Sequence, residues 1–85
     1  MPEISRFFGI VIAMLHREHE PAHFHARYGG QEVTIEIETG IVTGRMSKRA
    51  LRLVLEWYDL HRDELWADWQ RAIRKEPLDP IAPLE

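Results

Sequence analysis

The residues best suited to chemistry lie in one short stretch, HEPAHFHARYGG, which runs from His19 to Gly30. It brings together His19, His23, His25, Arg27 and Tyr28. An imidazole titrates near neutral pH, so a histidine can transfer protons, and it is also a common metal ligand. An arginine beside histidines is suited to binding a phosphate. The stretch therefore predicts either acid–base chemistry or metal binding.

A hairpin would place these side chains on one face of a sheet. Gly29 and Gly30 form a two-residue turn of the kind that joins antiparallel strands, because both positions tolerate positive φ. The turn pairs Tyr28 with Gln31, and the register then continues back to His23 opposite Glu36. Directly opposed residues point to the same side of a sheet. One face therefore collects Phe24, Ala26, Val33 and Ile35, and the other collects His23, His25, Arg27, Glu32, Thr34 and Glu36.

Three interpretations of the polar face are open. In the first, His23 and His25 act as a metal-free acid and base while Arg27 holds a phosphate, and no cofactor is needed. In the second, zinc or another divalent transition metal is bound by His19, His23, His25 and Glu36. In the third, the residues are the ordinary solvent-facing side of an antiparallel sheet. We carry the first forward as the prediction and keep the others as alternatives.

A cluster of cations surrounds the expected start of a helix after Ser47, which is a favourable N-cap residue. It consists of Arg45, Lys48, Arg49 and Arg52. Cations at this end oppose the helix dipole. A nucleic-acid phosphate would compensate for them, and so would the local glutamates or an acidic partner protein. We predict that Arg45, Lys48 and Arg49 bind the substrate or another anion.

The elements that must position these residues follow from the apolar pattern. We expect strands at about 7–15, 23–28, 31–37 and 41–46, a helical region at 47–75, and an extended tail at 77–85. Residues 7–15 are apolar on both alternating faces, which indicates a strand covered on both sides. The helical region contains no Gly or Pro, so it is either one kinked helix or two abutting helices. The prediction is an α+β fold, in which an antiparallel meander of about four strands packs against a long, possibly kinked C-terminal helix and is followed by an extended proline-rich tail.

The apolar side chains of the tail and of the helical region predict packing contacts beyond those between the helix and the sheet. Pro77, Pro80 and Pro83 recur every three residues, and each precedes a leucine or isoleucine. Polyproline II has three residues per turn, so the apolar side chains share one edge that would fit a groove of this chain or of a partner. The first half of the helical region has more apolar surface than four short strands can cover. We therefore expect a homodimer.

The composition excludes several classes of protein. With 85 residues the chain is expected to form a single domain over 1–85. It contains no cysteine, which excludes disulfides, thiolate metal sites and a cysteine nucleophile. The longest apolar run, FFGIVIAML, is too short to span a bilayer, and no signal peptide is recognisable. We predict a cytoplasmic protein without membrane contact. The net charge of −3 argues against general coating of nucleic acid but permits a local basic surface and a specific RNA.

Three stretches resemble one bacterial family of small proteins that is described only as a domain of unknown function. They are PEISRFFGI, HEPAHFHARYG and KRALRLVLEWYDLHRDEL. The resemblance as a whole covers nearly the entire chain, from Pro2 to about Leu84. The family's usual centre is HxPPHFHxRYG, and this chain has Ala22 in place of the second proline. Members are often encoded beside a second small protein, in pairs that resemble toxin–antitoxin modules. The resemblance thus implies a partner protein encoded nearby and singles out the histidine motif. Taken together with the histidine chemistry above, it leads us to predict one component of a toxin–antitoxin-like module, on the toxin side, acting on RNA without a metal. The alternatives are a protein-binding module, antitoxin-like or regulatory, without catalysis, and a metal-binding protein that uses the histidine cluster.

Overall fold

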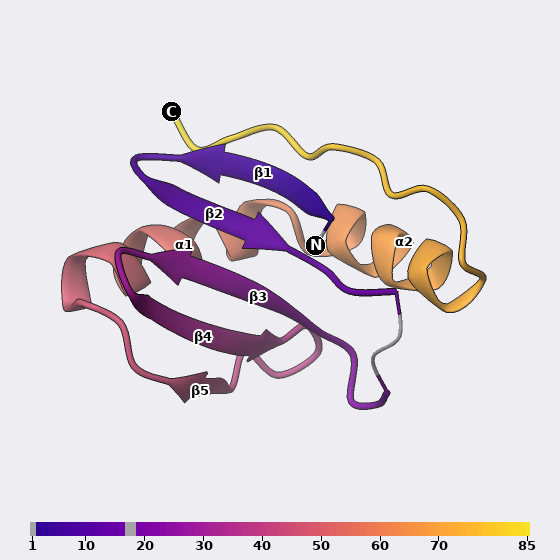
Figure 1. Cartoon of the computed structure of the whole chain (residues 1–85), viewed down its shortest axis with the longest axis horizontal. Coiled ribbons are helices and arrows are strands. Elements are labelled where there is room, and N and C mark those ends of the chain that lie inside the picture. Colours follow the sequence, from indigo (N-terminus) through magenta and orange to yellow (C-terminus); the bar gives the residue numbers. More distant parts are fainter. Residues whose placement is uncertain (1, 17–18) are drawn as a thin grey trace.

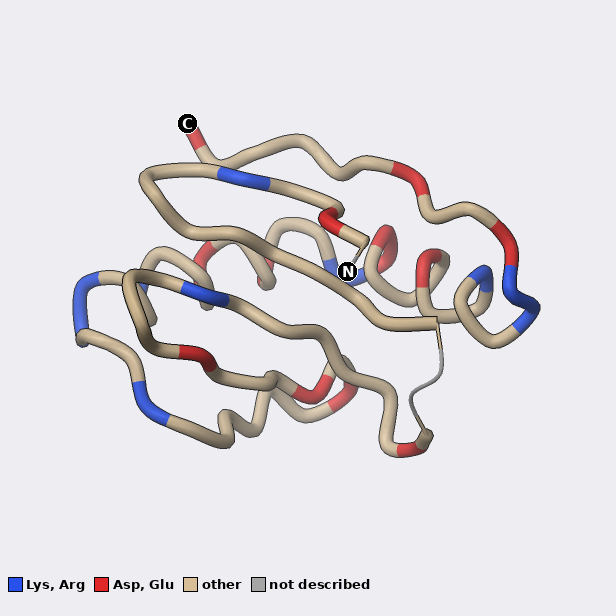
Figure 2. The backbone as a smooth tube through the Cα atoms, viewed as in Figure 1, with Lys and Arg blue, Asp and Glu red and all other residues tan. Residues whose placement is uncertain are grey.

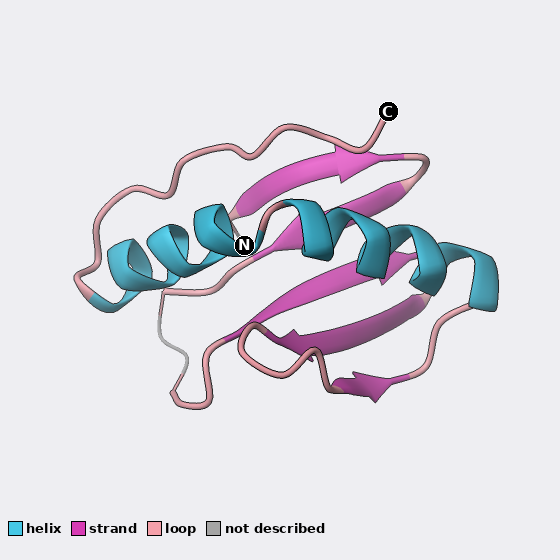
Figure 3. Cartoon of the chain, turned by 180° about the vertical axis from the view of Figure 1, so that it is seen from behind, coloured by secondary structure: helices cyan, strands magenta, loops and turns pink. Residues whose placement is uncertain are grey.

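The computed structural model describes residues 2–16 and 19–85. In these residues the elements follow in the order β1 (Glu3–Phe7), β2 (Ile10–Ala13), β3 (His23–Tyr28), β4 (Gln31–Glu36), β5 (Val42–Gly44), α1 (Lys48–Leu60) and α2 (Arg62–Ile73). The strands form one antiparallel sheet in the order β1-β2-β3-β4-β5, so each strand pairs with the next one in the chain (Figure 1). Both helices lie on the same side of this sheet (Figure 3). The predicted α+β fold is confirmed, and the face of the sheet opposite the helices is not covered by either of them; we call it the open face.

The predicted first strand, 7–15, is wrong: a turn at Phe8 and Gly9 divides this region into the end of β1 and all of β2. Phe8 has φ 50° and Gly9 has φ 80°. Positive φ at both central positions is what a tight two-residue hairpin turn requires. A bulky aromatic residue rarely adopts positive φ, so Phe8 does not indicate a turn, and the apolar pattern predicts one uninterrupted strand over 7–15. The division adds a strand and gives five instead of about four.

The hairpin of β3 and β4 has the predicted register. All six pairs form, from Tyr28 opposite Gln31 to His23 opposite Glu36. The side predicted to be apolar is buried against the helices, with Phe24, Ala26, Val33 and Ile35 at most 1% exposed. The polar side of the hairpin is consequently the open face of the sheet.

The predicted strand at 41–46 is shorter in the structure, where β5 covers only Val42–Gly44. Gly44 has φ 109°, a conformation that ends the extended backbone, and the chain then turns toward the helix. Ser47 caps that helix as predicted, because its hydroxyl accepts a hydrogen bond from the Ala50 N–H at 3.2 Å.

The helical region 47–75 consists of two abutting helices, α1 and α2, and not of one continuous helix. His61 separates them with φ −126° and ψ 26°, which is outside the helical region. Asp63 and Glu64 lie in the first turn of α2. Negative charges there stabilise a new helix N-terminus, so these residues favour a second start without a glycine or proline. The ring centroid of His61 lies 5.4 Å from that of Trp57, and its Nδ1 is hydrogen-bonded to Glu64, so His61 lies at the edge of the core.

Trp57 is the centre of the core. It is fully buried, and its ring centroid lies 5.6 Å from that of Phe7 and 5.8 Å from that of Phe24. Trp69 is also buried, at 2% exposure, while Trp66 is partly buried against the same core. All three tryptophans therefore contribute to the core. No helix in residues 2–16 and 19–85 is long and apolar enough to cross a membrane.

The proline-rich tail lies along β1 and against the helices of its own chain (Figure 1). Ile81 and Leu84 are buried. The Ile81 N–H donates to the Ile4 carbonyl at 2.8 Å, and the Trp57 indole N–H donates to the Ala82 carbonyl at 2.8 Å. The tail thus covers apolar surface that we had assigned to a second subunit, so that argument for a homodimer no longer holds.

Candidate functional site

The candidate site is a row of side chains on the open face of β3, the central strand of the sheet. His23, His25 and Arg27 are spaced two residues apart, so their side chains point to the same face. The ring centroids of His23 and His25 are 5.3 Å apart. The structure therefore brings together the two histidines that we predicted to act as acid and base.

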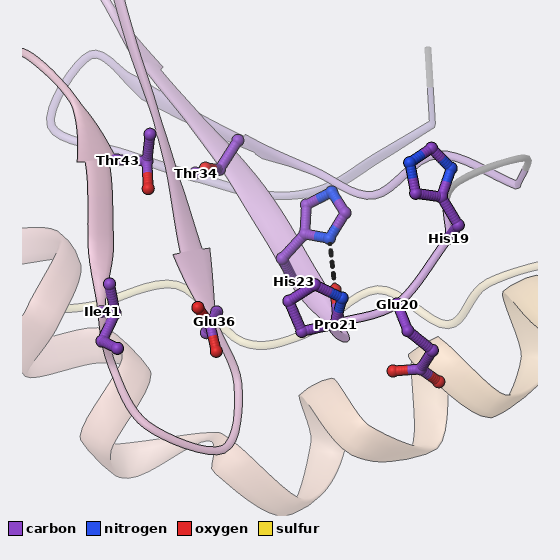
Figure 4. A pocket seen from close by; sticks show the side chains of 8 residues that line it. All are labelled: His19, Glu20, Pro21, His23, Thr34, Glu36, Ile41 and Thr43. Carbon is purple, nitrogen blue, oxygen red and sulfur yellow. Dashed lines mark hydrogen bonds between the residues drawn. The ribbon is translucent and has the colours of Figure 1, made fainter.

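His23 is held from two sides. Its Nδ1 lies 2.8 Å from the Pro21 carbonyl oxygen (Figure 4). A carbonyl can only accept, so Nδ1 carries the proton and Nε2 carries the lone pair of the neutral ring. The ring also packs near Trp69, with 5.6 Å between centroids. His23 thus has a defined tautomer and a defined orientation, which a general base requires.

His25 and Arg27 share one carboxylate. His25 Nδ1 lies 3.1 Å from Glu32 Oε2, and Arg27 Nε donates to Glu32 Oε1 at 2.9 Å. The hydrogen bond from Arg27, and then that from His25, lowers the pKa of Glu32 below its usual value. Glu32 is therefore ionised at neutral pH and would balance a positive charge on His25. The His25 side chain is only 12% exposed, whereas the Glu32 side chain is 43% exposed, so solvent still reaches the carboxylate.

Glu32 is a site residue that the sequence analysis placed on the polar face without giving it a role. The predicted register places Glu32 directly opposite Arg27, and this position could have indicated the ion pair between them. Nothing in the sequence indicates that the Pro21 carbonyl accepts from His23 Nδ1, because this hydrogen bond depends on how the segment before β3 bends back toward the strand.

A cavity of about 310 Å³ opens at the His23 end of this face. It is lined by His19, Glu20, Pro21, His23, Thr34, Glu36, Ile41 and Thr43. Figure 4 shows the side chains of β3, β4 and β5 on one side of it and those of the segment before β3 on the other. The cavity adjoins one member of the histidine pair, so a ligand bound in it would lie next to the candidate base.

The alternative metal ligands are only partly assembled. His19, His23 and Glu36 line the cavity, whereas His25 does not. Among residues 2–16 and 19–85, no three or more His, Asp or Glu side chains are placed to hold one metal ion. Glu36 Oε1 accepts a hydrogen bond from the Thr39 hydroxyl at 3.2 Å. Within the described residues the two histidines therefore lie side by side as a pair, without a third candidate ligand in place.

The predicted anion-binding residues are not beside the histidines. Arg45, Lys48, Arg49 and Arg52 are exposed, and we call these four residues the basic surface. The start of α1 lies near the turn between β3 and β4 (Figures 1 and 3), which is about 16 Å from His23 at the usual rise along a strand. Figure 2 shows Lys and Arg positions at that end of the molecule, where the chain enters α1, and acidic positions spread over the strands, helices and tail.

The basic surface lacks partners within the described part of the chain. None of its four side chains forms a hydrogen bond or ion pair with a residue in 2–16 or 19–85. Glu32 is engaged by His25 and Arg27, and Glu36 by Thr39. The pairing with local glutamates that we considered is therefore not formed, which leaves the cations available for an anion from outside.

The fold and the site define a small α+β protein with a five-stranded antiparallel sheet, two helices on one face, and a histidine–arginine row on the other. The chain belongs to the family named Domain of unknown function (DUF4160), whose model matches residues 9–70. This match confirms the resemblance to a small domain-of-unknown-function family over those residues. Searches of curated proteins and of solved structures give no significant match.

Proposed function

We propose that this protein is the RNA-acting component of a toxin–antitoxin-like pair and that it cleaves RNA without a metal ion. The observation that supports the chemistry best is the pair of adjacent histidines, each with Nδ1 held by a defined acceptor. The proposal of a paired partner protein comes from the gene arrangement that the family resemblance implies. A cytoplasmic location is part of the same proposal, because that is where an RNA-acting toxin meets its substrate.

In this mechanism His23 is the base and His25 is the acid. His23 Nε2 takes the proton of a ribose 2′-hydroxyl, and the 2′-oxygen forms a bond to the adjacent phosphorus. The bond from phosphorus to the 5′-oxygen of the next nucleotide breaks, and His25 donates a proton to that oxygen. The products are a 2′,3′-cyclic phosphate and a free 5′-hydroxyl, so the step consumes neither water nor a cofactor.

Glu32 and Arg27 support this step electrostatically. Glu32 is hydrogen-bonded to His25 and would stabilise its protonated form before the proton is donated. Arg27, oriented through its Nε by the same carboxylate, is next along the row after His25. A guanidinium at this position would stabilise the negative charge that develops on the phosphate oxygens.

The basic surface would bind phosphates farther along the RNA. No Asp or Glu occurs between Glu38 and Glu56, whereas this interval contains all four cations of the surface. The local charge is therefore strongly positive on a chain with a net charge of −3. Such a surface steers a polyanion and raises its rate of association, and salt weakens the effect.

The direct test is to incubate the purified protein with single-stranded RNA in excess EDTA and to assay for 2′,3′-cyclic phosphate ends. Each of His23→Ala and His25→Ala should reduce the rate by about 10²- to 10⁴-fold. His61→Gln is the matched control, because His61 lies at the helix junction and away from the open face. Cleavage that requires added metal, or that survives loss of both histidines, would contradict the proposal.

A growth experiment tests the biological role. Induction of the wild-type protein in a bacterial host should arrest growth, and the folded double variant His23→Ala, His25→Ala should not. Co-expression of the protein encoded nearby should relieve the arrest. A different result would identify a non-enzymatic binding module: neither the wild type nor the double variant affects growth, and both form a stable complex with the protein encoded nearby.

A further inference from the structure

We infer that the cavity beside His23 binds a nucleobase of the RNA and that its polar groups favour guanine. This inference rests on the proposed function, because the cavity adjoins the ring assigned as the base. It adds a preference for one base on the 5′ side of the bond that is cleaved.

Polar groups without partners surround the cavity. Glu36 Oε1 accepts from Thr39, but within residues 2–16 and 19–85 no hydrogen bond is formed by Glu36 Oε2 or by the hydroxyls of Thr34 and Thr43. Thr34 and Thr43 are directly paired between β4 and β5, so their side chains project to the same face. A carboxylate oxygen and two hydroxyls around one hollow provide hydrogen-bonding capacity for a polar ligand.

The charge of the lining selects against a phosphate in this place. Glu20 and Glu36 contribute carboxylates, and none of the lysines and arginines in the described part of the chain lines the cavity. The basic surface, which would bind phosphates farther along the RNA, lies near the other end of the β3–β4 hairpin (Figures 1 and 2). The cavity is therefore suited to a neutral group that donates hydrogen bonds, and a nucleobase is the part of an RNA with that property.

Guanine matches a carboxylate better than the other bases do. Its N1–H and exocyclic amino group are adjacent donors, so both oxygens of one carboxylate can accept from the same edge. Adenine and cytosine present one amino group beside an acceptor nitrogen, and uracil presents one N–H between two carbonyls. In the recognition of single-stranded RNA, unstacked bases are commonly read along this edge and stacked on a ring such as that of His23.

The location of the cavity also fits the chemistry. Its volume of about 310 Å³ is at the lower end of the range for small-molecule sites. His23 forms part of the wall, and His25 is the next residue on the same face of β3. A guanine in the cavity would hold its own ribose and 3′-phosphate over the two histidines.

The test measures binding separately from cleavage. Guanosine, adenosine, cytidine and uridine 3′-monophosphates are titrated into ¹⁵N-labelled protein, and dissociation constants are obtained from the amide shifts of Thr34 and Thr43. We expect the guanosine nucleotide to bind about 5- to 150-fold more tightly than the others, the usual range for one well-placed bidentate contact to a base. Glu36→Gln should abolish this preference. The exposed Glu38, which is outside the cavity lining, supplies the matched control Glu38→Gln.

The outcomes separate this inference from the proposed function. Selective binding of the guanosine nucleotide without RNA cleavage would support the nucleobase cavity and refute the nuclease. A second outcome is RNA cleavage that shows no preference for the base on the 5′ side of the cleaved bond, with the same cleavage rate in a folded Glu36→Gln variant. That result would overturn the inference and would not contradict the proposed nuclease. Equal affinity for all four nucleotides, or shifts confined to the basic surface, would also overturn it.

Discussion

Replacement of Ile81 by alanine tests whether the tail belongs to the folded core. The side chain is 5% exposed, and the backbone N–H of the same residue is bonded to Ile4. Truncation of a buried isoleucine to alanine costs about 2–5 kcal/mol. Because the tail is an edge segment that can shift to fill the space, we expect the lower part of that range, about 2–3 kcal/mol. The free energy of unfolding of a chain of this size is only about 4–13 kcal/mol.

The loss is large enough to measure by thermal denaturation. A change of 1 kcal/mol lowers the melting temperature of a domain of this size by about 4–8 °C, so Ile81→Ala should lower it by about 8–24 °C. The matched control is Ala82→Ser, because the Ala82 side chain is exposed and its carbonyl still accepts from Trp57. In the Ile81→Ala variant, the fluorescence of Trp57 should shift toward that of a solvated indole before the main transition.

Two results would refute this reasoning. A decrease of less than about 2 °C for Ile81→Ala, with unchanged tryptophan fluorescence, would mean that the tail is not packed on the core in solution. A melting temperature of the wild type that rises with protein concentration would mean that the stabilising contacts are made between copies of the chain.

Three further predictions concern the sheet, the shared carboxylate and the basic surface. Gly44→Ala should destabilise the protein by at least about 1–3 kcal/mol in urea denaturation, because the φ of 109° is strained for alanine and the new Cβ would lie 2.6 Å from the Glu32 carbonyl oxygen; an unchanged midpoint would contradict this. The hydrogen bond from Arg27 lowers the pKa of folded Glu32 below the usual 4.5, so its contribution to stability is complete above that pH and is lost as the pH falls through the folded pKa. The difference in melting temperature between wild type and Glu32→Gln should therefore shrink from pH 6 to pH 3, and a constant or growing difference would exclude the effect. Reversing both Lys48 and Arg49 to glutamate should reduce the slope of log affinity for single-stranded RNA against log salt by at least about 1.4, and an unaltered slope would show that these cations do not contact phosphates.

The parts of the fold that could be predicted are those with a local signal. The register of the β3–β4 hairpin followed from two glycines and an alternating apolar pattern, and the structure confirms it pair by pair. The helix start followed from Ser47, which accepts from the Ala50 N–H. Such features depend on residues close together in the chain, so the sequence determines them without knowledge of the tertiary structure.

The features that the sequence did not determine have different causes. Phe8 adopts a conformation that its size disfavours, and its ring contacts that of Phe7 edge to face, with 6.4 Å between the centroids. Around His61 the sequence is compatible with one kinked helix or two helices, although Asp63 and Glu64 favour the start of a second helix. The docking of the tail could be foreseen only as an alternative, because the groove is formed by β1 and both helices together.

The candidate site was predicted in its composition but not in its connections. The row of His23, His25 and Arg27 follows directly from the strand periodicity. The carboxylate bridge through Glu32 depends on side-chain conformations, and the cavity depends on how the segment before β3 and the loop before β5 approach each other. Neither can be obtained from spacing alone.

The register of β3 has a consequence for how the site forms during folding. Side chains alternate between the two faces, so a slip of one residue would turn the whole histidine row inward and expose Phe24 and Ala26 to water. The buried apolar face therefore selects the correct register, because a pairing shifted by one residue exposes apolar side chains to water and buries the histidine row in the core. The histidine row therefore reaches the face opposite the helices only when β3 and β4 pair in the register that also buries Phe24 and Ala26.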